Sequence, residues 1–240
     1  MSDIFDNLEG RRAIIDRRAL SDRLGEIAGE TSDTGKRRAA MVALLKTALE
    51  EGRAEINRRL LARPSSGRVA ANATAFLIDQ IVRLSHDFTV GHLYPSGNRS
   101  AGERITLIAV GGYGRGEMAP FSDIDIGFLT PFKQTSWTEQ VIEAQLYTLW
   151  DLGLKVGHSS RSLDEMIRAA KDDLTIRTAL LEARFIWGDR ELYDQASARF
   201  DAEVVAGNAR AFVAEKLAER DERHKRMGDS RYVVEPNVKE

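Results

Sequence analysis

The sequence predicts an α+β fold in which a small mixed β-sheet is flanked by N-terminal and C-terminal helices. Residues 104–160 carry short apolar or alternating segments typical of strands, whereas the segments on both sides repeat apolar residues at helical spacings of three and four. We therefore divide the chain into a polar lead-in over 1–35, a helical segment over 36–103, a β/α core over 104–160, and a second helical segment over 161–240 that is truncated at its end.

The composition narrows the class of protein. The chain has 240 residues, a net charge of −2 and 42% hydrophobic residues, which suits a globular protein without a basic field for nucleic acid. It has no cysteine, which excludes disulfides, thiolate zinc sites and thiol catalysis. The N-terminus lacks a hydrophobic signal core, and no apolar stretch reaches the ~18 residues of a membrane span. We expect a cytoplasmic protein with no nucleic-acid partner and no membrane association.

The N-terminal part is predicted to be helical. A loosely attached lead-in contains a short helix over 11–24, and a helix rich in arginine follows over 36–62. The stretch "ARPSSG" ends that helix, since proline and glycine stop helices. Apolar residues then recur at helical spacing over 69–88, and the stripe is wide enough to predict a well-buried helix.

Three strands are predicted in the core. The nearly continuous apolar run over 104–110 suits a buried strand. Residues 122–129 alternate, with Asp123 and Asp125 on one face and isoleucines on the other. A third strand is predicted over 154–160.

Helices follow each of the later strands. A helix is predicted over 136–153, because a capping box at Ser136 opens it and a glycine closes it. A second capping box at Ser162 opens helical segments that continue to about residue 227, with breaks near residues 172 and 188.

The two aspartates indicate a metal site. Residues at i and i+2 of a strand leave the same face, with Cα atoms about 6.6 Å apart. Two carboxylates this close repel each other, and burying them is costly without a cation. Carboxylate oxygens together with phosphate oxygens are ligands that Mg²⁺ prefers. We therefore predict Asp123 and Asp125 as metal ligands and catalytic residues, with Mg²⁺ as the cofactor.

The segment "GGYGRGEMAPFS" before the aspartates is predicted to bind a nucleotide. Gly111 and Gly112 end the first strand, and without Cβ atoms they can turn sharply and bring backbone N–H groups close to a triphosphate. Arg115 carries a planar charged fork suited to phosphate oxygens. Ser122, next to the first aspartate, completes the predicted nucleotide-binding set.

These residues carry a resemblance. Gly-Gly, a spacer of ten residues and Asp-Ile-Asp-Ile resemble the signature of the DNA polymerase β-like nucleotidyltransferase superfamily. With "GHSSRSLDE" (157–165), "DDLTIRTALLEARFIWGD" (172–189) and "RYVVEPNVKE" (231–240), the chain resembles the N-terminal domain of bifunctional PII uridylyltransferase/uridylyl-removing enzymes. The resemblance runs from about residue 36 to the end. It implies a polymerase β-like core that uses UTP and Mg²⁺ to transfer UMP onto a tyrosine of the PII nitrogen-signalling protein, releasing pyrophosphate.

The sequence departs from that pattern in two ways. Polymerase β-like enzymes usually have a third carboxylate on a later strand, but residues 154–160 contain no acid; Glu182, Glu235 or Glu240 could serve, or two carboxylates suffice. The chain also stops at "NVKE", where the family continues towards a metal-dependent hydrolase domain and two ACT domains. We therefore expect an excised transferase domain that binds Mg²⁺–UTP but transfers weakly by itself.

Other interpretations are weaker or stay open. Residues 114–119 formally fit the dinucleotide fingerprint GxGxxA, but that fingerprint must open a helix, and Pro120 follows at once. His158 is either a nucleotide or metal contact or an ordinary strand residue. Two alternative functions also stay open: a nucleotide-binding regulatory module with little turnover, and a related protein adenylyltransferase.

Overall fold

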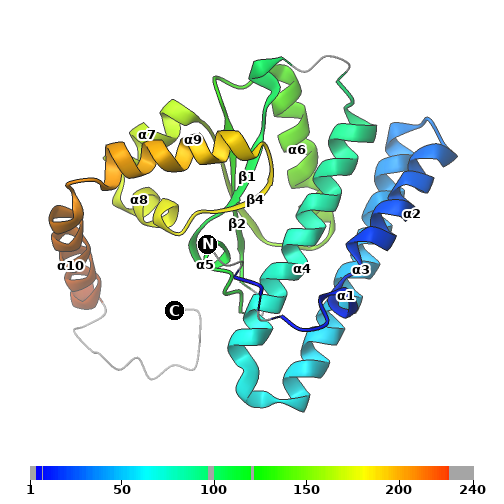
Figure 1. The fold of residues 1–240 in the computed structure, drawn as a ribbon, viewed down its shortest axis with the longest axis horizontal. Helices are drawn as coiled ribbons and strands as arrows, with labels where there is room; N and C mark the ends of the chain where they lie inside the picture. The colour runs from blue at the N-terminus through cyan, green and yellow to red at the C-terminus, as the bar shows by residue number, and fades with distance from the viewer. Residues whose placement is uncertain (1–3, 7, 97–99, 120–121, 227–240) are drawn as a thin grey trace.

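The computed structural model describes residues 4–6, 8–96, 100–119 and 122–226. In this part of the chain a four-stranded sheet of order β3-β2-β1-β4 lies between two groups of helices (Figure 1). β2 and β3 run parallel, and β1 is antiparallel to both β2 and β4. The strands are β1 (Thr106–Ala109), β2 (Ile124–Thr130), β3 (Val156–Ser162) and β4 (Arg184–Gly188). The predicted small mixed sheet is confirmed, with three strands within two residues of their expected places.

The fourth strand corrects the prediction that the chain is helical from 162 to about 227. The segment over 184–188 contains phenylalanine, isoleucine and tryptophan, which suit a strand. It pairs with the open edge of β1, with Ile108 opposite Phe185. Three consecutive apolar residues, Phe185 to Trp187, have no periodicity that separates a strand from a helical turn. The pairing with β1 therefore decided its conformation.

The helices occupy most of the remaining described chain. The longer ones are α2 (Arg17–Glu30), α3 (Thr34–Ala62), α4 (Gly67–Phe88), α6 (Ser136–Asp151), α7 (Leu163–Asp172), α8 (Leu174–Leu181), α9 (Arg190–Phe200) and α10 (Ala209–Arg226). Short turns of helix are α1 (Arg11–Ile14), α5 (Gly111–Gly114), η1 (Pro64–Ser66), η2 (Thr89–Leu93), η3 (Ala101–Glu103) and η4 (Asp201–Val205). None of the described helices is long and apolar enough to cross a membrane.

The two faces of the sheet pack against different helices. On β2, Ile124, Ile126 and Phe128 belong to the larger apolar core, which includes residues of α3, α4 and α6. Leu129 of β2 and Ile108 of β1 belong to a second core with residues of α7 and α9. The predicted alternation of β2 is therefore confirmed. Because side chains alternate along a strand, Asp125 is on the same face as Leu129.

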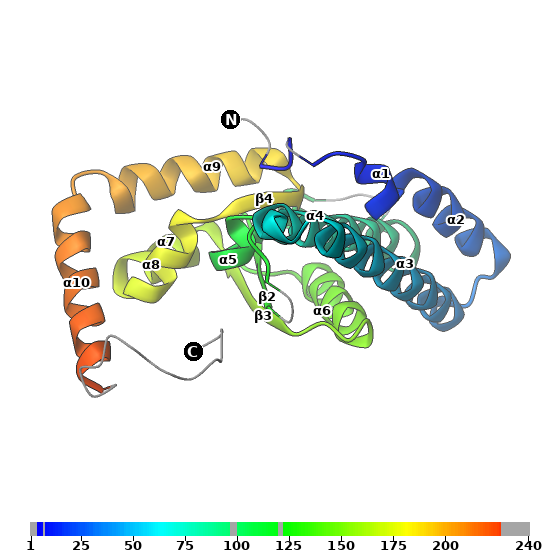
Figure 2. The same ribbon diagram turned by 90° about the horizontal axis from the view of Figure 1, so that it is seen from below.

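The lead-in is packed, not loosely attached as we predicted. Phe5, Leu8, Leu24 and Ile27 are each at most 6% exposed and belong to the larger core. Figure 2 shows α1 and α2 beside α3 and α4. The apolar residues of this segment stand among many charged residues, so its overall composition is polar. Their burial follows from contacts with helices that come later in the chain.

The helix caps confirm one prediction and correct another. Ser162 and Glu165 form the predicted capping box of α7. For α6 the N-cap is Thr135, whose hydroxyl accepts a hydrogen bond from the Thr138 amide, so the box starts one residue before the predicted Ser136. Gly153, with φ 75°, follows the end of this helix as expected.

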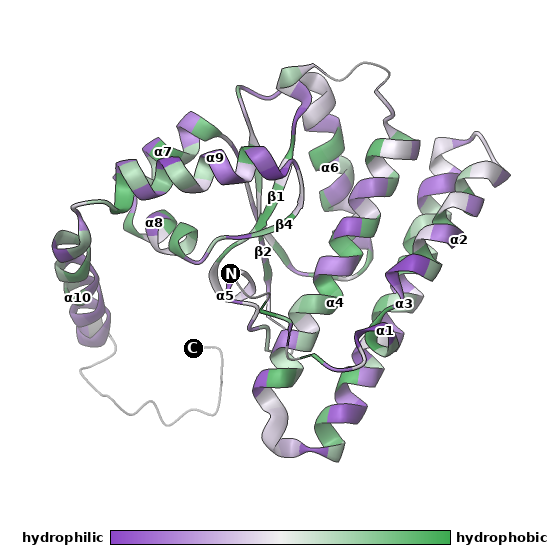
Figure 3. Ribbon diagram, viewed as in Figure 1, coloured by the Kyte–Doolittle hydropathy of each residue, from purple (hydrophilic) through white to green (hydrophobic). Residues whose placement is uncertain are grey.

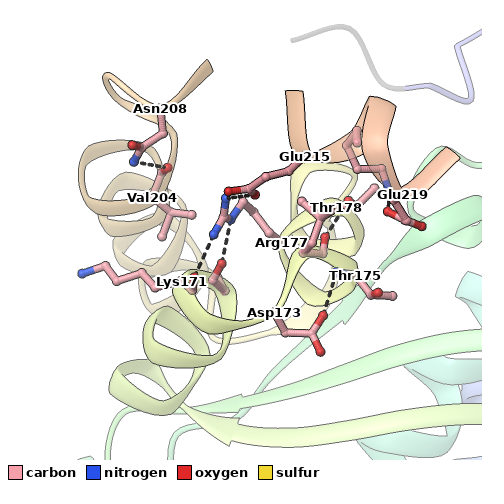
Figure 4. A network of polar contacts seen from close by, with 12 residues as sticks. Lys171, Asp173, Thr175, Arg177, Thr178, Val204, Asn208, Glu215 and Glu219 are labelled. Carbon is pink, nitrogen blue, oxygen red and sulfur yellow. Dashed lines mark hydrogen bonds and ion pairs between the residues drawn. The ribbon is translucent and has the colours of Figure 1, made fainter. Parts of the chain in front are cut away.

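The last described helix, α10, contacts α8 and projects away from the sheet (Figures 1 and 2). Arg177 of α8 donates to the carbonyl oxygens of Ala170 and Lys171, at 2.9 and 2.7 Å, and its Nη1 lies 3.3 Å from Oε2 of Glu215 on α10 (Figure 4). Hydrophilic residues cover much of α10 (Figure 3).

Candidate active site

One end of the sheet collects the segments that the sequence singled out. Ala109, at the end of β1, is opposite Ile126 of β2 and Arg184 of β4. Ile124, at the start of β2, is opposite Val156 at the start of β3. The C-terminal end of β1 therefore lies beside the N-terminal ends of the other three strands. The glycine segment and the aspartate segment lie together at this end of the sheet.

The glycine segment forms a single helical turn, α5, directly after β1. Gly111 has φ 59°, a left-handed conformation that favours glycine. The amides of Gly114 and Arg115 donate to the carbonyl oxygens of Val110 and Gly111, at 3.0 and 3.1 Å, and close the turn. The first N–H groups of a helix have no acceptor within the helix. Those of Gly111 and Gly112 are thus placed at the end of the turn where an anion can accept them.

The Asp125 carboxylate lies between two glycines. A Cβ atom on Gly157 would lie 2.5 Å from its Oδ1, and one on Gly111 would lie 3.5 Å from its Oδ2. Gly157 is directly opposite Asp125 in the parallel pairing of β3 with β2. The carboxylate therefore occupies space that a side chain at residue 157 would fill, and it faces the start of α5.

Gly157 is a site residue that sequence reasoning missed. Its role depends on the register between β2 and β3, and the sequence carries no signal for that register. The glycine is the first residue of "GHSSRSLDE" (157–165), a segment that contributed only to the family resemblance.

Asp123 and Ser122 precede β2, which begins at Ile124, two residues later than predicted. Asp123 is exposed and Ser122 is half-buried. The Ile124 amide donates to the Lys155 carbonyl oxygen at 2.8 Å and holds the start of β2 against β3. Asp123 is thus next to the strand that carries Asp125, at its solvent-exposed end.

Arg115 lies beside the glycine turn, where two carboxylates hold its guanidinium. Its Nη1 is 2.6 Å from Oε1 of Glu182, and its Nε is 3.3 Å from Oε2 of Glu117. The hydrogen bond to Glu182 is the main cause of a raised pKa for Arg115. A Cβ atom on Gly112 would lie 3.7 Å from Nη2 of the same guanidinium. A phosphate that binds Arg115 must therefore compete with two acidic partners.

Of the three glutamates that could supply a third acid, the structure describes one, Glu182. Glu182 is the partner of Arg115, and within the described residues no group of three histidine or acidic side chains is placed to hold a metal ion. Glu235 and Glu240 lie outside the described residues. His158 is opposite Ile126, so its side chain lies on the face of the sheet opposite to that of Asp125. Its ring centroid is 6.2 Å from that of Trp150.

Comparisons with known proteins agree with this geometry. Residues 97–186 match the family model described as a nucleotidyltransferase domain, and residues 211–240 match the model described as GlnD PII-uridylyltransferase. The chain is 66% identical over 237 residues to a protein of Novosphingobium aromaticivorans, and these residues make up 99% of this chain and 26% of the relative. It is 56% identical over 229 residues to a protein of Rhodospirillum rubrum, and these residues make up 95% of this chain and 24% of the relative. Both relatives are named bifunctional uridylyltransferase/uridylyl-removing enzyme.

The mixed sheet, the glycine turn after its first strand and the aspartates at the start of the next define a nucleotidyltransferase domain of the polymerase β-like type. The chain spans about a quarter of the length of the curated relatives it matches. Over nearly its whole length it is similar to bifunctional uridylyltransferase/uridylyl-removing enzymes.

Proposed function

We propose that this chain transfers UMP from UTP to a tyrosine of the PII signal protein and releases pyrophosphate, as the transferase domain of a larger nitrogen-sensing enzyme. The observation that carries the proposal is the Asp125 carboxylate beside the Gly111 turn, in space that the glycine opposite it on β3 leaves open. The names of the relatives support uridylyl transfer as the reaction.

We infer that Mg²⁺ is the cofactor, held by Asp123 and Asp125. The donor set fits this ion, because Mg²⁺ is usually bound by one or two carboxylates while phosphate and water oxygens complete its shell. The space that Gly157 leaves at Asp125 keeps that carboxylate beside the glycine turn. When bound, the ion neutralises the negative charge of the phosphates.

The residues of the chain then position the reactants. Backbone N–H groups of Gly111 and Gly112 hold phosphate oxygens, and Arg115 contacts the phosphates that will leave. The deprotonated tyrosine oxygen forms a bond to the α-phosphorus as the bond to the bridging oxygen breaks, and that oxygen leaves with pyrophosphate. Positioning and charge stabilisation contribute most of the rate in such a transfer.

Incubating the protein with PII, UTP and Mg²⁺, and measuring the mass of PII, tests the proposal. Addition of one UMP per modified tyrosine supports it. UTP binding without any transfer identifies a nucleotide-binding regulatory module. Faster transfer of AMP from ATP identifies an adenylyltransferase. Cytoplasmic location and the absence of a nucleic-acid partner stay predictions.

Arg115→Ala is expected to weaken UTP binding and leave UMP binding almost unchanged, because UMP lacks the outer phosphates. A charge-assisted contact of this kind contributes about 1.5–3 kcal/mol. We expect the lower end, about tenfold in Kd, because the Arg115 side chain is 48% exposed and must give up its two carboxylate partners. Calorimetry with both nucleotides measures the difference. Equal losses for UTP and UMP would place Arg115 away from the outer phosphates.

Glu182→Gln is the matched variant for the same contact. It removes the negative charge of the partner at 2.6 Å but conserves the shape of the side chain. The remaining hydrogen bond to the guanidinium is weaker and easier for a phosphate to displace, so UTP binding should stay level or become tighter. A loss of UTP binding as large as that of Arg115→Ala would instead assign Glu182 itself to the nucleotide site.

A further inference from the structure

A polar cluster around the buried Asp79 joins three distant segments behind the glycine turn. Asp79 of α4 is 0% exposed. The Tyr113 hydroxyl of α5 donates to its Oδ1 at 2.8 Å. Arg184 of β4 donates from Nη1 to Oδ2 at 2.6 Å and from Nη2 to Oδ1 at 3.1 Å, a two-pronged contact. Burial, followed by the charge of Asp79, raises the pKa of Tyr113 well above its ordinary value, so the phenol keeps its proton.

Arg184 also binds the backbone of the turn. Its Nε donates to the Gly114 carbonyl oxygen and its Nη2 to that of Tyr113, both at 3.2 Å. These are carbonyl groups at the C-terminal end of α5, where helices leave oxygens without partners and where a cation is favourable. Its guanidinium is also within cation–π distance of the Phe5 ring, at 5.1 Å, so the packed lead-in covers it.

This arrangement holds the turn against the rest of the fold. A four-residue helix is not stable by itself, because its nucleus is costly to form. The Tyr113 side chain of this turn reaches α4, and Arg184 of β4 donates to two carbonyl oxygens of the turn. A buried Arg–Asp pair contributes little net stability compared with apolar residues, because desolvation opposes the attraction. Fixing one orientation of the turn is a role that apolar residues of similar size would not fill.

We propose that Arg184, backed by Asp79, is a positioning residue that holds the Gly111–Gly112 turn in the orientation that accepts a nucleoside triphosphate. The proposal deepens the proposed function and rests on it for the identity of the ligand as UTP. Arg184 acts through the turn and does not itself touch the nucleotide. Its distance from the aspartates along the chain is what kept it out of the sequence-based prediction.

The test is Arg184→Lys, compared with Arg104→Lys. Lysine keeps the charge beside Asp79 but lacks the planar fork that reaches both the carboxylate and the carbonyl oxygens. Arg104 makes a similar two-pronged contact with Asp189, at 2.5 and 2.9 Å, at the other end of β1 and β4. The control therefore breaks the same kind of Arg–Asp contact at the opposite end of the sheet, away from the turn. It joins the residues that flank β1 and β4, whereas Arg184 joins β4 to α4.

Two readouts are expected to separate these variants. In Arg184→Lys, UTP binding should weaken roughly tenfold, as expected for loss of a charge-assisted contact network, while UMP binding changes little. Amide hydrogen exchange of Gly114 and Arg115, which close the turn, should accelerate, while that of Ile126 in β2 stays protected. Arg104→Lys should change neither. Tyr113→Phe, which removes only the hydroxyl donor to Asp79, should shift both readouts in the same direction by less.

The proposal is overturned if Arg184→Lys and Arg104→Lys have the same UTP affinity and the same amide hydrogen exchange in the turn. If Arg184→Lys does not fold, Tyr113→Phe decides, and unchanged exchange in the turn overturns the proposal. If the wild-type chain binds no UTP, the proposed function fails, and the exchange measurement still decides whether Arg184 holds the turn.

Discussion

Asp125→Asn is expected to abolish UMP transfer while the protein stays folded. The substitution removes a charged ligand beside the glycine turn but conserves the shape that fits against Gly157. Loss of one preorganised charge-stabilising group costs about 10²–10³ in kcat, and a metal ligand should reach or exceed the upper end. Relief of repulsion between two nearby carboxylates favours the apo protein. Its melting temperature without Mg²⁺ should therefore stay level or rise.

Asp123→Asn should act in the same direction, and Asp22→Asn, at an exposed position of α2, is the control. Turnover is measured from the mass of PII over time, and folding from thermal melts with and without Mg²⁺. Mg²⁺ should raise the melting temperature of the wild type in the presence of UTP more than that of either site variant. If Asp123→Asn or Asp125→Asn keeps more than a few per cent of wild-type turnover, the assignment of the metal site is wrong.

Gly157→Ala is expected to have the next largest effect on activity with a small effect on stability. The new Cβ atom would lie 2.5 Å from Oδ1 of Asp125, closer than real contacts allow. The carboxylate is the far end of a side chain and can rotate away, so the fold tolerates the change. A displacement of about 1 Å in a catalytic group can cost roughly a hundredfold in rate. We expect a loss of that order in kcat, with the melting temperature close to that of the wild type.

Gly67→Ala is the matched control, because a Cβ atom there meets nothing within 4 Å. It should leave both turnover and UTP binding unchanged. A Gly157→Ala variant with wild-type turnover would mean that Asp125 works equally well in another rotamer, and the glycine would then have no role in the site. A large loss of stability would instead point to the pairing of β2 with β3.

Local patterns were enough to predict much of the fold. The helix α4 and the strands β1 and β2 followed from apolar spacing alone, since each pattern lies within one segment. The glycine turn and the aspartates were recognisable because they lie twelve residues apart along one short connection, from Gly111 to Asp123. A chain leaving a strand must turn before it can pair again, so this connection already implied that both groups meet at one end of a sheet.

Pairings between distant segments were decided only by the tertiary structure. β4 is a strand because β1 offers an edge for it, and Gly157 faces Asp125 because β3 aligns with β2 in one register. Arg115 is bound by Glu182, 67 positions later, and Arg184 reaches Asp79, 105 positions earlier. Such contacts leave no periodic trace in the sequence, because their energy comes from burial and charge pairing after the chain has folded. The residues to which we assign the chemistry were therefore recognisable in the sequence, whereas the residues that contact and position them were not.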